Sequence, residues 1–210
     1  NQMQVQRSID LGFADGVRAL MRQDPDIVMI GEIRDLETAE MAVQAALTGH
    51  LVVSTLHTND APAAITRLLD LGVPAYLINS TLLGVMAQRL IRTLCPHCKK
   101  AMPITEDQKI AWRALVAPWK SKEPEQLHQA VGCLECRMTG YSGRVGIYEI
   151  LLNSPELRKL IRPNAEMARI RDLASREGMR PLRISGALKV AQGLTSLEEV
   201  IKVAPPADEQ

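Results

Sequence analysis

The stretch from Asp24 to Asp35 reads Asp-Pro-Asp-Ile-Val-Met-Ile-Gly-Glu-Ile-Arg-Asp. Its continuous apolar run, Ile27–Ile30, is typical of a short strand with both faces covered. Glu32 follows just beyond the carboxyl end of that strand. The stretch therefore predicts a buried strand that presents a carboxylate at its tip.

A second stretch, Thr48 to Asn59, repeats the arrangement with a different side chain. It reads Thr-Gly-His-Leu-Val-Val-Ser-Thr-Leu-His-Thr-Asn, and the strand expected over Leu51–Thr55 is followed by His57. A helix is expected between the two strands, over Leu36–Leu47, with Asp35 as its N-cap. A β-α-β unit of this kind places its two strands parallel and side by side.

Glu32 and His57 should then face one crevice, because ligands of open α/β sheets bind beyond the carboxyl ends of the strands. A carboxylate and an imidazole together suit chemistry on a water molecule and a phosphate. By itself, an acid at a strand end is more often a plain surface residue. The surrounding Gly-Glu-Ile-Arg-Asp sequence favours the functional interpretation, as an atypical Walker B strand in which Gly31 and Glu32 replace the usual Asp.

Further candidates for contact with a nucleotide lie near these strands. Thr55 ends the second expected strand, Arg34 follows the first closely, and an imidazole such as that of His57 can hydrogen-bond a γ-phosphate. His50 precedes its strand and so lies at the opposite end of the sheet, where a structural role and use by a neighbouring subunit stay open. Arginines that could reach phosphate across a subunit boundary are Arg34, Arg67, Arg89 and Arg92.

Four cysteines form the strongest chemical signal in the sequence. They occur as two Cys-x-x-Cys pairs, Cys95 with Cys98 and Cys133 with Cys136, which together can supply the four thiolates of a structural zinc site. One pair alone could be a redox motif, whereas two pairs favour metal. A closed four-thiolate site leaves no open coordination position, so we expect its role to be structural.

Composition narrows the remaining function classes. The net charge is +1 and aromatic residues make up 3% of the chain, which argues against nucleic-acid binding through phosphate contacts or base stacking. No apolar run is long enough for a membrane span. No Gly-x-x-x-x-Gly-Lys-[Ser/Thr] loop occurs, so the 210 residues supply at most half of a nucleotide site. We expect the sequence to be part of a longer protein.

The remaining pattern is mostly helical. We expect a helix that starts near Pro62 and ends before Gly72, and another from about Pro74 to Leu90. A short helix and a loose loop should follow between the cysteine pairs. From Tyr148 onward the sequence predicts helices that open at Ser154, Asn164, Pro181 and a capping box Thr195-Ser196-Leu197-Glu198, and a frayed tail from Ala204.

Together these motifs resemble the secretion ATPases of type II secretion and type IV pilus assembly. The atypical Walker B strand, the His-containing second stretch and the four cysteines all match that family. So do the segments Gly143-Arg-Val-Gly-Ile-Tyr-Glu149 and Gly193-Leu-Thr-Ser-Leu-Glu-Glu199. Retraction motors of the same superfamily share the first two motifs but lack the cysteines, which favours an assembly or secretion motor.

The resemblance implies an α/β fold: a partial RecA-like parallel sheet with helices, a tetracysteine zinc subdomain and a small C-terminal helical domain, over residues 1–93, 94–147 and 148–210. It implies a homo-hexameric motor, cytoplasmic and peripherally bound to the bacterial inner membrane, that uses ATP with Mg²⁺ and contacts platform and other secretion proteins of that membrane. Glu32 is then the catalytic carboxylate, His57 contacts the γ-phosphate side, and the cysteines bind one structural zinc. The fragment alone is expected to be inactive.

Two other interpretations stay open at this point. In the first, the chain is a non-catalytic zinc module that binds protein partners through the tetracysteine region. In the second, it is a nucleic-acid motor or a zinc-ribbon binder, which the balanced charge disfavours.

Overall fold

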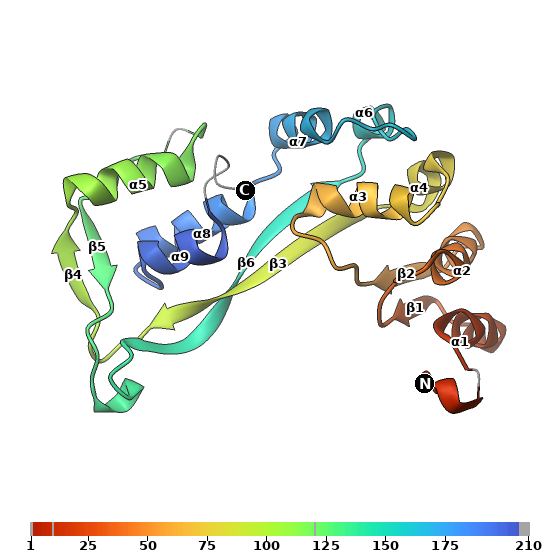
Figure 1. Ribbon diagram of the computed structural model, residues 1–210, viewed down its shortest axis with the longest axis horizontal. Coiled ribbons are helices and arrows are strands. Elements are labelled where there is room, and N and C mark those ends of the chain that lie inside the picture. The colour runs from red at the N-terminus through yellow and green to blue at the C-terminus, as the bar shows by residue number, and fades with distance from the viewer. Residues whose placement is uncertain (1, 10, 120, 206–210) are drawn as a thin grey trace. The chain divides into compact units, whose positions relative to one another are not determined.

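The computed structural model in Figure 1 describes residues 2–9, 11–119 and 121–205. The chain divides into two compact units. The first unit is Asn1–Val85 with Leu151–Gly178, and the second is Met86–Ile150 with Met179–Gln210. Within the described ranges, no helix has the length and apolar character that a membrane crossing requires. Residues 206–210 of the tail expected from the sequence lie outside the described residues.

A parallel strand pair forms the centre of the first unit. Strand β1 (Ile27–Ile30) pairs with β2 (Leu51–Ser54), and helix α2 (Leu36–Leu47) connects them, which confirms the predicted β-α-β unit. Asp35 caps α2 as predicted, since its carboxylate accepts a hydrogen bond from the Thr38 N–H at 2.8 Å.

Helices make up most of the rest of the first unit. Their apolar faces form its core, in which Val28, Ile65, Ile78 and Ile170 are 2% exposed or less. The elements are η1 (Arg7–Ile9), α1 (Phe13–Leu20), η2 (Met21–Gln23), α3 (Ala61–Asp70), α4 (Ala75–Thr81), α6 (Pro155–Arg158) and α7 (Met167–Arg176).

One face of the β1–β2 pair is exposed, so the prediction that both faces are covered is wrong. Ile27 and Met29 on β1 are 62% and 71% exposed, and their register partners Leu51 and Val53 are 46% and 44% exposed. The four side chains share a face because alternate strand residues point the same way. The opposite face packs on the helices through Val28 and Ile30, which explains the continuous apolar run.

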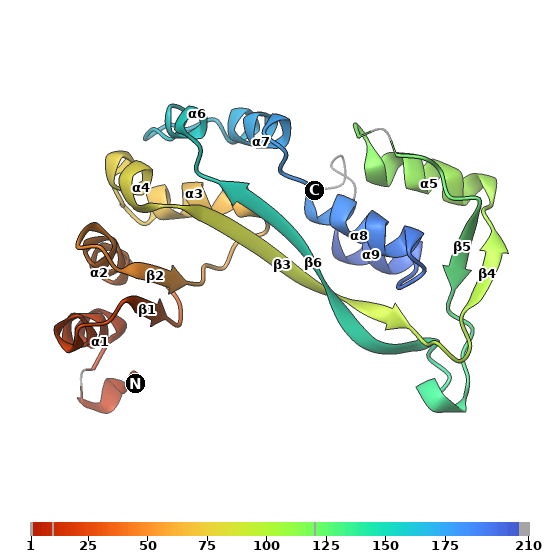
Figure 2. The same cartoon turned by 180° about the vertical axis from the view of Figure 1, so that it is seen from behind.

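The second unit contains most of two long strands, whose terminal residues Gly84–Val85 and Leu151–Leu152 belong to the first unit. Strands β3 (Gly84–Leu94) and β6 (Tyr141–Leu152) pair with each other, and their arrows point in opposite directions in both views (Figures 1 and 2). A short antiparallel pair, β4 (Lys100–Pro103) with β5 (Gln126–Gln129), lies between them in sequence. The other elements of this unit are α5 (Glu106–Val116), η3 (Leu134–Cys136), α8 (Leu182–Ala191) and α9 (Leu197–Val203).

The helix predicted from Pro74 to Leu90 is wrong beyond its first two turns. Helix α4 ends at Thr81, and β3 begins at Gly84. Gly84 lies so close to the opposing strand that an added Cβ would be 2.8 Å from the Leu151 carbonyl oxygen. The burial of Ala87 and Ile91 follows strand alternation, which a continuous apolar run hides.

Two further predictions need correction. The segment from Tyr148 is not yet helical, because β6 continues to Leu152. The stretch between the cysteine pairs is more ordered than a short helix and a loose loop, since two paired strands flank α5. Thr105 caps that helix through a reciprocal capping box with Gln108.

The C-terminal helices occur close to where the sequence predicts them. Helix α7 begins at Met167 instead of Asn164, and α8 follows Pro181 as expected. The capping box at α9 is wrong by one residue. Ser196 is the N-cap, and its hydroxyl accepts from the Glu199 N–H at 3.3 Å.

The buried and exposed isoleucines of the first unit give a test of its core. Ile65→Ala should lower the free energy of unfolding by about 2–5 kcal/mol, because Ile65 is fully buried and the substitution leaves a cavity. Ile27→Ala, at an exposed position, should change it by about 0.5 kcal/mol or less. Urea unfolding of both variants measures the difference, and equal losses would contradict this core.

Candidate functional site

Glu32 and His57 meet at the carboxyl ends of β1 and β2. His57 Nε2 lies 3.0 Å from Glu32 Oε2 and donates a hydrogen bond to it. The imidazole is 80% exposed and the carboxylate side chain 22% exposed, so the pair faces solvent. The parallel strand pair thus places an acid and an imidazole in one shared site, as the sequence predicts.

The backbone beneath this pair is fixed by two hydrogen bonds across the strand ends. Thr55 Oγ1 donates to the Gly31 carbonyl oxygen at 2.7 Å, and the Ile33 N–H donates to the Thr55 carbonyl oxygen at 3.0 Å. The residues on either side of Glu32 are therefore held against the end of β2. Thr55, predicted as a nucleotide contact, has a structural role in this geometry.

Arg34 completes the charged group at this edge. Its Nε donates to Glu32 Oε2 at 2.6 Å, the same oxygen that His57 contacts. The hydrogen bond from Arg34 lowers the pKa of the Glu32 carboxyl, partial desolvation opposes this, and His57 lowers it further. Among the described residues, Glu32 Oε1 accepts no hydrogen bond.

This arrangement favours some chemical roles over others. A carboxylate with a lowered pKa stays ionised at neutral pH and is a weak proton acceptor. It is better suited to orient a water molecule or an Mg²⁺ ion, and Mg²⁺ is usually held by one or two carboxylates together with substrate phosphates. Glu32 fits that requirement through its second oxygen.

The other candidate residues lie elsewhere. His50 is at the start of β2, where its Nδ1 is 2.9 Å from the Ala45 carbonyl oxygen and 3.0 Å from Thr48 Oγ1. It therefore stabilises the C-terminal end of α2, away from the Glu32–His57 pair. Arg67 is exposed on α3, and Arg89 donates to the Gln88 carbonyl oxygen.

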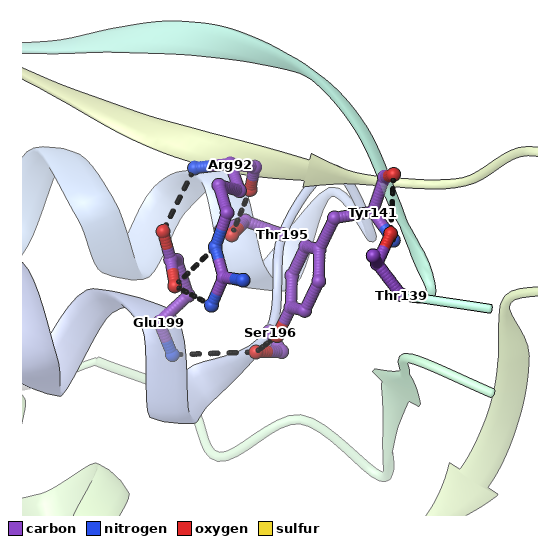
Figure 3. Close-up of polar contacts among 6 residues, drawn as sticks. All are labelled: Arg92, Thr139, Tyr141, Thr195, Ser196 and Glu199. Carbon is purple, nitrogen blue, oxygen red and sulfur yellow. Dashed lines mark hydrogen bonds and ion pairs between the residues drawn. The ribbon is translucent and has the colours of Figure 1, made fainter. Parts of the chain in front are cut away.

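Arg92, in the second unit, is already engaged. Its Nε and Nη2 donate to Glu199 Oε2 at 3.0 and 2.5 Å, and its guanidinium carbon lies 4.0 Å from the centre of the Tyr141 ring (Figure 3). The hydrogen bonds between the two side chains lower the pKa of the Glu199 carboxyl and raise the pKa of the Arg92 guanidinium. An arginine held in this way is a poor candidate for an arginine finger. Sequence reasoning missed the partner because 107 residues separate the two.

The four cysteines converge in the second unit. The Sγ–Sγ distances are 3.9 Å for Cys95 and Cys133, 3.8 Å for Cys98 and Cys136, and 3.7 Å for Cys133 and Cys136. All four sulfurs lie within 4.8 Å of one another, and all four thiols are free. These separations are far longer than the S–S bond of about 2.0 Å in a disulfide.

The distances fit a tetrahedral zinc site. Four sulfurs that each lie about 2.3 Å from one ion lie about 3.8 Å from each other. Backbone N–H groups also point at the sulfurs, as the N–H of Gly132 donates to Cys98 Sγ at 3.3 Å and that of Gly140 to Cys136 Sγ at 3.2 Å. Such donors stabilise thiolates, so the residues present fit the metal.

The thiol pKa values differ within the second pair. Burial raises the pKa of Cys136, but hydrogen bonds from the N–H groups of Cys133 and Gly140 outweigh it and bring the value down to about 6. A backbone hydrogen bond from Cys136 lowers the pKa of Cys133, while burial and the neighbouring thiols raise it to about 11. Without metal, therefore, Cys136 ionises far more readily than Cys133.

Comparison with known proteins identifies the family. Residues 1–202 match the family described as "Type II/IV secretion system protein", and the chain belongs to that family. The tetracysteine cluster and the strand-end pair lie within the matched residues.

Curated relatives carry the names of secretion and pilus motors. The chain is 58% identical over 205 residues to the type IV pilus assembly ATPase TfpB of Acinetobacter baylyi, which covers 98% of this chain and 34% of that protein. It is 52% identical over 203 residues to the type II secretion system ATPase E of Vibrio cholerae, which covers 96% of this chain and 39% of that protein. The chain thus spans little more than a third of the length of these relatives.

Solved structures agree with this fold. The pilus retraction motor PilT with bound ADP is similar at a TM-score of 0.62 and 29% identity, over 95% of this chain and 45% of that one. The Legionella pneumophila ATPase DotB is similar at a TM-score of 0.63 and 25% identity, over 95% of this chain and 44% of that one.

Metal content tests the cysteine cluster. Protein purified under reducing conditions should hold about one zinc per chain, and Cys98→Ser should lose most of it, since three thiolates remain. Elemental analysis after gel filtration measures the ratio. Removal of the metal should unfold mainly the region around the cysteines, because zinc binding supplies folding free energy there. A metal-free wild-type chain with an unchanged fold would contradict the assignment.

The Glu32 carboxyl gives a test of the strand-end electrostatics. Its pKa should lie below that of an ordinary Glu, and Arg34→Ala should raise it, because the largest cause of the lowering is then gone. Carbon-detected NMR titration of the carboxyl measures both. Because the folded pKa is lowered, the stability that this pair contributes is present above the unfolded pKa and is lost as pH falls through the folded one. A Glu32 pKa that does not respond to Arg34→Ala would rule out this cause.

Proposed function

We propose that the chain is the C-terminal part of an ATP-hydrolysing motor that powers type II protein secretion, by pseudopilus assembly, or type IV pilus assembly. The observation that supports this most directly is the 3.0 Å contact between Glu32 and His57 at the tips of two parallel strands. Family membership and relatives named as secretion and pilus ATPases support the same proposal.

In this proposal, the strand-end residues act on the terminal phosphate of ATP. Glu32, kept ionised by Arg34, orients the attacking water and the Mg²⁺ ion through its free oxygen. His57, fixed by its hydrogen bond to Glu32, presents an exposed ring to the γ-phosphate side. When bound, Mg²⁺ neutralises charge that develops on the phosphates.

We assign the cysteine cluster a structural zinc ion. Four thiolates complete its coordination and leave no position for substrate. The ion would hold together the two chain segments that carry Cys95–Cys98 and Cys133–Cys136, which are separated by a small helical and stranded insertion.

Family membership also supports a proposal for how the whole protein assembles. We propose a RecA-like core, a homo-hexamer, and a cytoplasmic position at the bacterial inner membrane in contact with platform and other secretion proteins. We also propose that the 210 residues alone neither bind ATP tightly nor hydrolyse it, because their sequence contains no phosphate-binding loop with its lysine.

Substitution of Glu32 tests the function. In the full chain with an intact phosphate-binding loop, Glu32→Gln should lower ATP turnover by about 100-fold or more while ATP still binds, because the amide cannot orient water and metal as the carboxylate does. Glu40→Gln, on the exposed face of α2, is the matched control and should keep normal turnover. Phosphate release and nucleotide-binding assays measure the two quantities. Normal turnover in Glu32→Gln would remove Glu32 from the mechanism.

A further inference from the structure

A charged contact joins helix α7 to the loop that carries His57. Arg171, on α7, donates to Asp60 Oδ2 from Nη2 at 2.6 Å and from Nε at 3.2 Å. Asp60 Oδ1 accepts from the Ala63 N–H at 2.8 Å and so caps α3. Both residues belong to the first unit, in which α3 and α7 pack together. The Asp60 carboxylate thus lies at the end of the loop that carries His57, caps α3 and binds α7.

The loop between β2 and α3 is therefore fixed at both ends. At its start, Thr55 is hydrogen-bonded to the Gly31 carbonyl oxygen, and at its end Asp60 is held by Arg171 and by its own cap. Residues 56–59 span these two anchors. Within this span, His57 contacts the Glu32 edge through its hydrogen bond to Glu32 Oε2.

The geometry sets this contact apart from an ordinary surface ion pair. Most exposed pairs join two flexible side chains and contribute little. Here the Asp60 side chain is only 16% exposed, it is immobilised by its cap, and the guanidinium contacts it through two nitrogens. Both nitrogens donate to the same oxygen, Oδ2, so the planar guanidinium is directed at that oxygen by two charge-assisted hydrogen bonds.

We propose that Arg171 is a positioning residue for His57. Through Asp60, it holds the end of the loop and so keeps the imidazole at the Glu32 edge in the orientation that ATP hydrolysis requires. The inference rests on the proposed function for its catalytic consequence. It also assigns α7, which the sequence places in a separate C-terminal domain, to the support of the catalytic edge.

Steady-state kinetics of the full chain test the catalytic part. Arg171→Ala should lower kcat by about 10-fold to 100-fold with little change in KM, because misplacement of a group that acts in the transition state costs rate more than substrate binding. The kcat of Arg171→Lys should lie between those of the wild type and Arg171→Ala, since a lysine keeps the charge but loses the second nitrogen contact. Arg169→Ala is the matched control, because Arg169 lies on the same helix and pairs only with Glu166 among the described residues.

A double-mutant cycle separates positioning from general damage. If Arg171 acts through His57, then adding Arg171→Ala to His57→Ala should lower kcat by no more than about twofold beyond His57→Ala alone. If the double variant instead loses kcat by the product of the factors measured for the two single variants, the inference is wrong.

Hydrogen exchange of the 210-residue chain tests the positioning itself, without any activity. Arg171→Ala should speed amide exchange at residues 56–61 and at Ala63, whose N–H is bonded to the Asp60 carboxylate, by about 10-fold, while exchange in β1 and α2 and in the Arg169→Ala control stays at the wild-type rate. Unchanged exchange at residues 56–61 and at Ala63 would overturn the inference even if the motor is active. If the wild-type full chain shows no ATP turnover, the proposed function is wrong. If it is active but Arg171→Ala and Arg169→Ala have the same kcat, only this inference is wrong.

Discussion

The parallel register of β1 and β2 is the constraint on which the candidate site depends. Ile30 pairs with Ser54 at the carboxyl ends of the two strands, and the chain leaves both strands on the same edge. A shift of the pairing by one residue would send every side chain to the other face of the sheet. The hydrogen bond from Thr55 to Gly31 secures this register at the point where it matters. Only then can an acid and an imidazole from sequence positions 25 residues apart share one hydrogen bond.

In the second unit, the question is what stabilises the turns that carry the cysteines. Its core includes Trp112, Leu115 and Leu127, whereas the turn that carries Cys133 and Cys136 leaves Leu134 and Met138 89% and 66% exposed. Hydrogen bonds connect these turns to the segment that precedes α9, since Lys99 Nζ donates to the Gly193 carbonyl oxygen and the Leu94 N–H to that of Leu194, each at 2.8 Å. Metal coordination would add the stability that packing does not supply. The Gly193–Glu199 motif thus has a structural explanation.

How far the sequence predicts this structure depends on how local each signal is. The β-α-β unit was predictable because a cap at Asp35 and two short apolar runs mark its elements within a few residues. Strand β3 was not, because its apolar residues suit a buried helix as well as a strand, and only its pairing with β6 decides. The spacing of the cysteines predicted that they converge, because two Cys-x-x-Cys pairs can supply the four thiolates of a structural zinc site.

Long-range partners were beyond the sequence for a simple reason. Arg92 with Glu199 and Asp60 with Arg171 are separated by 107 and 111 residues, and neither pair belongs to a motif with fixed spacing. Exposed arginines are numerous, so the sequence offers no means to select the few that are bound. The bare apolar face of β1 and β2 was hidden likewise, because a run of apolar residues does not show which of them are covered.

The most direct test of the central claim is an experimental structure of the full chain with Mg²⁺ and a non-hydrolysable ATP analogue. The account predicts that the terminal phosphate lies at the edge formed by Glu32 and His57, with a water molecule or the metal ion in hydrogen-bonding or coordination distance of the Glu32 carboxylate. An analogue bound at another edge of the sheet, with both side chains directed away from its phosphates, would contradict the account.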